Sequence, residues 1–136
     1  MGFRTTAQVR FAHIDAAAIV FYPRYFEFLN GAVEDWFAAM GHDFHGLHVR
    51  RQLGVPTVSL QCEFQAPSEL GDLLDIEIEP RRLGGSSCAY DFRMSAGGQQ
   101  RILGNGVLVC MDLSARKSVP WPDDMRAAMM PYLLTA

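Results

Sequence analysis

Polar and apolar residues alternate along several stretches of this chain, and such alternation is typical of strands that bury one face. The strands expected from it are residues 4–11, 57–64, 73–80, 88–95 and 101–112, the last being longer and more apolar than the others. Two glycine pairs, Gly84-Gly85 and Gly97-Gly98, separate three of these stretches and are typical of hairpin turns. The pattern therefore predicts an antiparallel sheet.

Between the first and second of these strands the apolar period changes to that of a helix. Residues 23–40 place Phe26, Leu29 and Val33 on one stripe. Proline is favoured at the first position of a helix and glycine just after its end, so we expect a helix between Pro23 and Gly41. A short second helix is expected over residues 123–133, and the histidine-containing segment 42–54 is expected to be a loop or lid.

Strands with one apolar face must bury that face, and the single long helix has an apolar stripe suited to cover it. A curved antiparallel sheet wrapped around one central helix is the hotdog arrangement, of the α+β class. With 136 residues, the chain is long enough for one packed domain and not for two, so we expect a single domain over residues 1–136.

Composition narrows the possible partners. The chain is 49% hydrophobic with a net charge of −3 and has no basic run, which argues against nucleic acid as the main partner. We expect no membrane association, because no apolar stretch is long enough to span a bilayer and the N-terminus lacks the apolar core of a signal peptide. Cys62, Cys88 and Cys110 lie at wide spacing within strand-like segments, so we expect buried free thiols and a cytoplasmic protein.

The candidate catalytic residues lie just before the long helix. Asp15 is a lone acid in an apolar stretch, about seven residues upstream of the expected helix start near Tyr22 and Pro23. A helix N-terminus offers free N–H groups and the positive end of a dipole. A carboxylate beside it suits acyl transfer, with the acid attacking or activating water and the N–H groups stabilising an oxyanion. Pro23 has no N–H, so Tyr22 is the expected donor.

The segment IDAAAIVFYPRYFEF, residues 14–28, resembles the signature of the 4-hydroxybenzoyl-CoA thioesterase family of hotdog proteins. Weaker similarities follow in the same order at VPTVSLQCEFQAPSELGDLL, RLGGSSCAYDF and VPWPDDMRAAM. The resemblance implies acyl-CoA thioester hydrolysis with Asp15 in the place of the catalytic acid and Tyr22 at the oxyanion site. The hydrolysis that the resemblance implies needs no cofactor or metal, since coenzyme A is part of the substrate.

Further site residues are expected near Asp15 and along the helix, where Asn30 interrupts the apolar stripe and either lines a pocket or faces a neighbouring subunit. Substrate contacts are expected from Ala18, Ile19, Asn30, Thr57 and Ser59. Ala18 stands where the family usually has glycine, so either the turn does not need a positive φ or the loop is rearranged. His13 stands where relatives often have an acid, and we interpret it as a structural or charge-tuning neighbour of Asp15.

Coenzyme A is expected to meet the hairpin that follows the third strand. Arg81 and Arg82 can make charge-assisted contacts to phosphates, and the small residues Gly85, Ser86 and Ser87 let backbone N–H groups approach them. The alternative is a solvated hairpin.

Other acidic and histidine residues have simpler explanations. His42, His45 and His48 lack a standard zinc spacing, so a solvated lid is favoured over a metal site. Glu34 and Asp35 could be an alternative nucleophile position, but a solvated or interface face of the helix is the favoured explanation.

Two other functions remain open. A hotdog acyl-thioester dehydratase would use His13 with Asp15, and the change at Ala18 leaves room for a non-catalytic acyl-CoA-binding protein. The absence of a G-x-S-x-G motif favours hydrolysis without a serine triad. Aromatic residues around the helix start favour an aromatic or medium-chain acyl group. An isolated hotdog leaves its sheet edge uncovered, so we expect a homodimer or homotetramer with the pocket at the subunit boundary.

Overall fold

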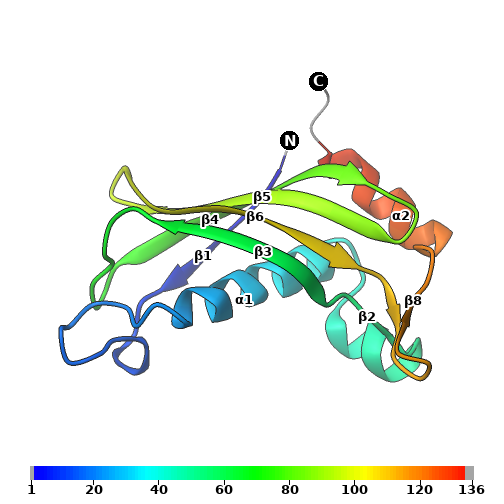
Figure 1. Cartoon of the computed structure of the whole chain (residues 1–136), viewed down its shortest axis with the longest axis horizontal. Coiled ribbons are helices and arrows are strands. Elements are labelled where there is room, and N and C mark those ends of the chain that lie inside the picture. The colour runs from blue at the N-terminus through cyan, green and yellow to red at the C-terminus, as the bar shows by residue number, and fades with distance from the viewer. Residues whose placement is uncertain (1, 134–136) are drawn as a thin grey trace.

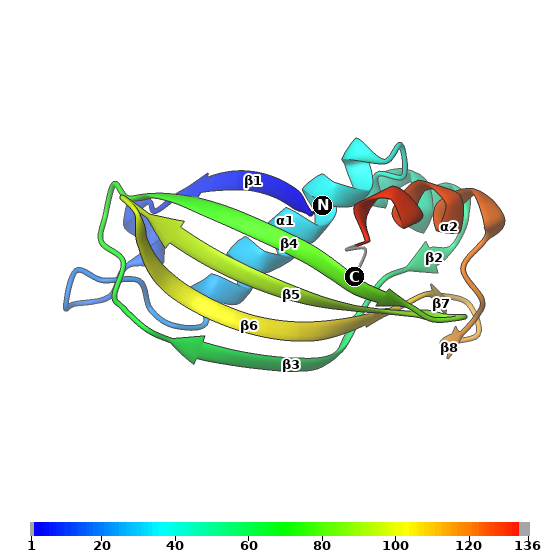
Figure 2. The same cartoon turned by 90° about the horizontal axis from the view of Figure 1, so that it is seen from above.

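The computed structural model describes residues 2–133, and its main feature is a curved five-stranded antiparallel sheet wrapped around one long helix (Figure 1). The order across the sheet is β1-β4-β5-β6-β3. Its strands are β1 (Phe3–Gln8), β4 (Leu73–Leu83), β5 (Ser87–Ala96), β6 (Gln99–Val109) and β3 (Thr57–Phe64). The helix, α1 (Arg24–Ala39), crosses the concave face, as the view in Figure 2 shows. The expected α+β hotdog fold is confirmed.

The helix forms where the sequence pattern predicts it. Pro23 immediately precedes the first helical residue, and Gly41 follows the end with φ +86°, a conformation that glycine adopts without strain. One stripe of α1 is buried against the sheet, consisting of Tyr25, Phe28, Leu29, Ala32, Val33, Trp36 and Phe37. Burial of this stripe fixes the direction of α1 and therefore the position of its N-terminus.

The inner face of the sheet carries the other half of the core. Alternate residues of β4 and β5 are buried, including Ile76, Ile78 and Phe92, as the period of two predicts. Gly104 and Gly106 on β6 face the same core. A Cβ at Gly104 would lie 2.5 Å from the Phe92 ring, and one at Gly106 would lie 2.8 Å from the Tyr90 hydroxyl oxygen. The two glycines therefore let neighbouring rings lie flat across β6.

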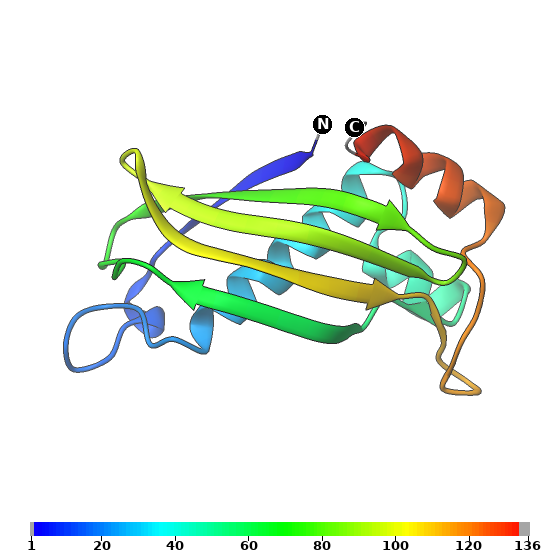
Figure 3. The same cartoon turned by 45° about the horizontal axis from the view of Figure 1, so that its top comes forward.

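Smaller elements close the end of the molecule where α1 ends (Figure 3). They are β2 (Leu53–Gly54), β7 (Met111–Asp112) and β8 (Lys117–Ser118), which form a three-stranded sheet, and α2 (Asp123–Met129) followed by a 3-10 turn (Met130–Tyr132). The expected strand over 101–112 is thus divided into β6 and β7, and the expected helix over 123–133 is shorter.

The segment 42–54, expected to be a loop or lid, is more ordered than a plain loop. It contains a π-helical turn (Gly46–Arg50) in which Leu47 is buried, and the Arg51 guanidinium makes two hydrogen bonds to the Asp124 carboxylate, of 2.7 and 3.1 Å. The Phe44 and His48 rings stack with their centroids 5.4 Å apart. The Arg51–Asp124 contact fastens the segment to α2, at the opposite end of α1 from Asp15.

The cysteines are free within the described residues, as expected. Burial raises the pKa of the Cys88 thiol to about 12, so it stays protonated and unreactive at neutral pH. Cys110 is also buried, whereas Cys62 on β3 is only partly covered. No helix in residues 2–133 is long and apolar enough to cross a membrane.

Candidate active site

Asp15 lies in a short hairpin between β1 and α1. The Asp15 N–H donates to the Ile19 carbonyl over 3.0 Å, and the Phe21 N–H donates to the His13 carbonyl over the same distance. Residues 13–15 therefore run antiparallel to residues 19–21 and are joined by a tight turn, in which the Ala18 N–H donates to the Asp15 carbonyl over 2.9 Å. This pairing holds the acid on the segment that leads directly into the helix.

The turn fixes both the carboxylate and an unusual backbone conformation. One carboxylate oxygen of Asp15 accepts the Ala17 N–H over 2.8 Å, so the side chain is oriented although it is exposed. Ala18 has φ +64°, the left-handed conformation that a hairpin of this kind usually assigns to glycine. The turn therefore keeps the positive φ without the glycine. The alternative that the turn needs no positive φ is therefore wrong, because Ala18 adopts one despite the strain.

One backbone donor at the helix start has no acceptor. The Arg24 N–H donates to the Phe21 carbonyl over 2.8 Å, and the Tyr25 N–H donates to the Tyr22 carbonyl over 3.2 Å. Pro23 has no N–H to offer. The Tyr22 N–H makes no hydrogen bond within residues 2–133, and the Tyr22 residue is exposed. An approaching carbonyl oxygen can therefore accept this N–H close to the positive end of the helix dipole.

His13 supports the hairpin through its ring. Its Nδ1 accepts the Arg10 N–H over 2.8 Å, and the ring packs edge-on against Phe28 with centroids 4.6 Å apart. Because Nδ1 already accepts a hydrogen bond, that nitrogen carries no proton in this arrangement. These contacts agree with a structural role for His13.

A neighbouring loop anchors the other side of the hairpin. The Val20 N–H donates to the carbonyl of Ser68, which is completely buried. Arg101 holds this loop by donating to the Ser68 hydroxyl over 3.2 Å and to the Asp72 carboxylate over 2.8 Å. The pKa of Asp72 lies below its ordinary value, first because it accepts the Glu69 N–H and then because it accepts Arg101. The hairpin is thus held from both sides.

An apolar groove of about 290 Å³ adjoins the helix start. Its lining includes Ile19, Tyr22, Tyr25 and Phe64. Phe64, at the end of β3, lies with its ring centroid 5.9 Å from those of both Tyr22 and Tyr25. The sequence analysis did not identify Phe64 as a site residue, because its position depends on how far β3 curves toward the helix. Ile19 was predicted and lies in this groove.

A second groove, of about 330 Å³, follows between α1 and β3. It brings together Asn30 and Thr57, both predicted as substrate contacts, beside Leu60 and Tyr90. The Asn30 amide donates to the Glu34 carboxylate over 3.0 Å. Ser59 does not line this groove, because it alternates with Leu60 along β3 and so faces the other side of the sheet.

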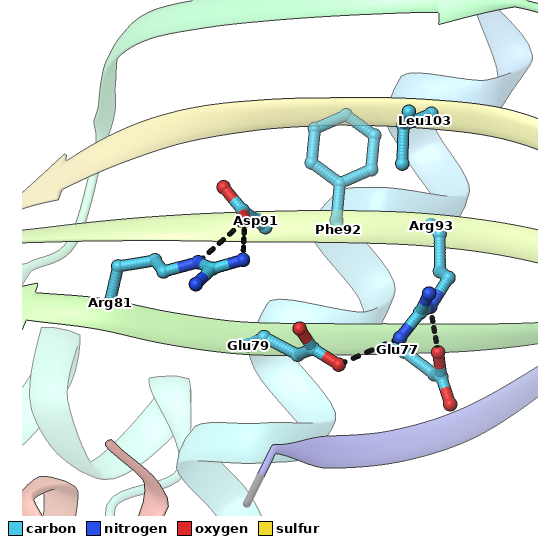
Figure 4. A pocket seen from close by; sticks show the side chains of 7 residues that line it. All are labelled: Glu77, Glu79, Arg81, Asp91, Phe92, Arg93 and Leu103. Atoms are coloured by element: carbon cyan, nitrogen blue, oxygen red, sulfur yellow. Dashed lines mark hydrogen bonds and ion pairs between the residues drawn. The ribbon is translucent and has the colours of Figure 1, made fainter. Parts of the chain in front are cut away.

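The predicted coenzyme A residues belong to the end of β4 and the turn into β5, which lies at the opposite end of the sheet from the segment between β1 and α1 that contains Asp15 (Figure 2). Arg81 is on the outer face and bonds Asp91 over 2.6 Å, beside the contacts of Arg93 to Glu77 and Glu79 (Figure 4). Arg82 is exposed and makes no ion pair with any described residue.

The hairpin from Gly85 to Ser87 is pinned to the segment around α2. Its carbonyls at Gly85 and Ser87 accept the backbone and indole N–H groups of Trp121, over 2.9 and 3.0 Å, and its Gly84 carbonyl accepts the Arg126 side chain. The turn is therefore rigid, and within one subunit it does not meet the Asp15 hairpin.

The remaining candidates are the metal-ligand types and two acids of α1, of which Glu34 contacts Asn30 at the edge of the second groove. Within residues 2–133 no three His, Cys, Asp or Glu side chains converge as metal ligands would. Glu34 and Asp35 are exposed on α1, and Asp35 accepts the Thr5 hydroxyl over 2.9 Å.

A hotdog sheet, an oriented carboxylate before the central helix and an unpaired N–H at the helix start are the features expected of a hotdog acyl-thioester enzyme. Residues 9–129 match the model of the thioesterase-like superfamily. The chain belongs to this superfamily, which confirms the resemblance found in the sequence.

Individual relatives of known sequence or structure are consistent with membership of this superfamily. The chain is 32% identical over 120 residues to the 1,4-dihydroxy-2-naphthoyl-CoA hydrolase of Thermosynechococcus vestitus, covering 88% of this chain and 82% of that protein. It is 24% identical over 127 residues to the acyl-CoA thioesterase YbgC of Haemophilus influenzae, covering 93% of both. The solved structure of the gentisyl-coenzyme A thioesterase BH1999 superposes with a TM-score of 0.84 at 26% identity, covering 91% of this chain and 99% of that one.

Proposed function

We propose that this protein is an acyl-CoA thioesterase that uses Asp15 as its catalytic acid and the Tyr22 N–H as its oxyanion donor. The observation that carries this proposal is the hairpin in which the Ala17 N–H orients the Asp15 carboxylate just before a helix start with one unpaired donor. A thioester suits such a site because its thiolate leaves readily, so one carboxylate and one oxyanion donor can suffice.

In this mechanism the thioester carbonyl oxygen accepts the Tyr22 N–H. The Asp15 carboxylate either attacks the carbonyl carbon to give an anhydride, which water then hydrolyses, or removes a proton from an attacking water. Both routes expel coenzyme A as its thiolate and release the free acid. The Asp15 oxygen that does not accept the Ala17 N–H is the one available for this step.

The acyl group we propose is a hydroxylated aromatic acid. Aromatic side chains line the groove at the helix start, including Tyr22, Tyr25 and Phe64, and offset or edge-on contacts between rings favour aromatic ligands. Two of the relatives described above are named for naphthoyl and gentisyl thioesters. The next groove along α1 supplies the polar side chains of Asn30 and Thr57.

We further propose that the working unit contains at least two copies paired through β3. This edge strand is exposed along nearly its whole length, with exposed fractions of 61% at Val58 and 51% at Phe64. An uncovered apolar edge strand favours pairing with another strand. In a two-fold symmetric antiparallel pair, the start of one β3 lies near the end of the other.

That pairing would make the site composite. The groove containing Asn30 and Thr57 of one subunit would lie beside the helix start and Asp15 of its partner. Arg82 and the Gly85–Ser87 turn, which lie far from Asp15 in one chain, would lie toward the partner's Asp15 and could contact coenzyme A there.

No observation favours the dehydratase alternative. That reaction requires a base that removes a proton next to a carbonyl, and the Nδ1 of His13 is already bonded to the Arg10 N–H. The ring also packs against Phe28, which agrees with a supporting role.

The test is free-thiol release by the purified protein from benzoyl-, hydroxybenzoyl-, octanoyl- and crotonyl-CoA, with hydration of crotonyl-CoA measured in parallel. The proposal predicts thiol release that is fastest with an aryl-CoA. Hydration without thiol release would support a dehydratase instead. Tight binding of acyl-CoA without turnover of any of the four would support a binding protein.

A further inference from the structure

The Tyr90 hydroxyl is a buried polar group without a partner. Tyr90 is 1% exposed, and its hydroxyl is one of three buried side-chain polar atoms in residues 2–133 that make no hydrogen bond, the others being Trp36 Nε1 and Arg101 Nε. Leaving a buried donor unpaired destabilises the folded state. Such a group in a folded protein requires an explanation.

The surroundings of Tyr90 show where its hydroxyl lies. Tyr90 is on the inner face of β5, in register with Gly106 on β6 and, through it, with Leu60 on β3. Because Gly106 has no side chain, the phenol extends across β6, where a Cβ would lie 2.8 Å from the hydroxyl oxygen. The side chain thus ends in the wall of the groove between α1 and β3.

That groove is apolar at most positions and polar at few. Its apolar lining consists of Phe26, Leu29, Val33, Val55, Pro56, Leu60 and Leu108. Asn30, Thr57 and Tyr90 are the polar members, and only Tyr90 is both buried and unpaired. A mostly apolar cavity with a few convergent polar groups is typical of a ligand site.

The protonation state of Tyr90 makes it a permanent donor. Burial raises the pKa of Tyr90 to about 12, and the Thr57 hydroxyl, which lies close to the phenol but outside hydrogen-bond geometry, has a smaller opposing effect. The phenol therefore keeps its proton at neutral pH and can donate to an oxygen that enters the groove. Asn30 and Thr57 are exposed and can exchange their contacts with water, whereas the Tyr90 hydroxyl is buried.

We propose that Tyr90 is a specificity-determining residue, whose hydroxyl donates a hydrogen bond to a ring hydroxyl of an aromatic acyl group lying in this groove. The proposal rests on the proposed thioesterase function and deepens it. A hydroxylated ring satisfies the buried donor, whereas an unsubstituted ring leaves it unpaired. The enzyme therefore prefers hydroxylated aryl thioesters, and this preference depends on one oxygen atom of Tyr90.

The experiment compares Tyr90→Phe with the wild type on four substrates: benzoyl-CoA and its 2-, 3- and 4-hydroxy derivatives. For at least one hydroxylated substrate, kcat/KM should fall roughly tenfold, the size expected for one lost hydrogen bond to a buried group. For benzoyl-CoA it should stay unchanged or rise, because the variant no longer leaves a donor unpaired. The wild-type preference for a ring hydroxyl should therefore nearly vanish in the variant.

Tyr132→Phe is the matched control. It removes the same atom from a tyrosine that packs on Phe3 and Trp36, away from the groove, and should leave the preference unchanged. An equal fall for benzoyl-CoA and all three hydroxylated substrates in Tyr90→Phe would show a structural effect only and would overturn the inference. If the wild type hydrolyses aryl-CoA but Tyr90→Phe keeps its preference, only this inference fails. If the wild type hydrolyses no aryl-CoA, both proposals fail.

Discussion

Replacing Ala18 by glycine should stabilise the protein, although the change removes a methyl group. Ala18 has φ +64°, where the Cβ of an L-residue crowds the backbone and costs roughly 1–2 kcal/mol. Glycine adopts this conformation without that cost. It loses more backbone conformational entropy on folding, however, which lowers the free energy of unfolding by about 0.4–1 kcal/mol. The difference predicts that Ala18→Gly raises the free energy of unfolding by about 0.5–1 kcal/mol.

Urea unfolding of the wild type, Ala18→Gly and Ala16→Gly measures this effect with an internal control. Ala16 lies in the same exposed turn and has no positive φ, so glycine there should lower the free energy of unfolding by roughly 0.5–1 kcal/mol. In thermal unfolding, the Tm of Ala18→Gly should rise by about 2–5 °C.

One result would refute the reasoning, and a second would extend it to catalysis. If both glycine variants are destabilised by the same amount, Ala18 carries no backbone strain. If Ala18→Gly loses thioesterase activity while gaining stability, the strained conformation itself takes part in catalysis.

Three further predictions concern assembly, coenzyme A and metals. The protein should be a homo-oligomer in light scattering at micromolar concentration, and Leu60→Lys on the exposed strand β3 should shift it toward monomer with lower activity; a monomeric, fully active wild type would contradict the composite site. Arg82→Ala should raise KM for an acyl-CoA more than for the corresponding pantetheine thioester, since Arg82 lacks a counter-ion among the described residues and is available to a phosphate. The control variant Arg116→Ala should change KM for neither substrate. Equal effects of Arg82→Ala on both substrates would argue against a phosphate contact. Exhaustive EDTA treatment should leave kcat unchanged and His45→Ala should alter KM little, whereas loss of turnover that zinc restores would require a mechanism with a metal-bound water.

The sequence predicts the core elements well because their patterns are local. β3 has the bounds expected from its alternation, and α1 differs from the expected helix by one residue at each end. Both hairpins form at the expected glycine pairs. In each case, the side-chain period and the turn residues determine the structure without help from distant contacts.

The parts that were not predicted depend on contacts between distant segments. The turn at Gly46–Arg50 has no clear periodicity and is held by the Arg51–Asp124 pair, 73 residues apart. Phe64 and Tyr90 were interpreted only as strand residues, since their places beside α1 depend on the curvature and register of the sheet. Glycine at position 106 opposite an aromatic residue is the one sequence signal that could have indicated the phenol in the groove.

The sequence predicts which residues are candidates for the site better than it predicts which of them lie close together in the fold. The Asp15 hairpin and the Tyr22 N–H lie together as expected, because they are close in sequence. Arg82 and the Gly85–Ser87 turn lie at the far end of the sheet, since antiparallel strands of about eleven residues separate the two ends. Whether they serve the same site depends on a second subunit, which one chain's sequence does not reveal.

The most direct test of the proposed mechanism is kcat for thiol release by Asp15→Asn, compared with Asp35→Asn, on the best aryl-CoA. Asparagine keeps the size and the hydrogen bond from Ala17 but can neither attack nor take a proton, so kcat should fall by roughly 10²–10⁴-fold while circular dichroism stays unchanged. Asp35→Asn, which changes an exposed acid on α1, should keep the wild-type kcat. A folded Asp15→Asn variant with near wild-type kcat, or a comparable loss in Asp35→Asn, would contradict the assignment of Asp15 as the catalytic acid.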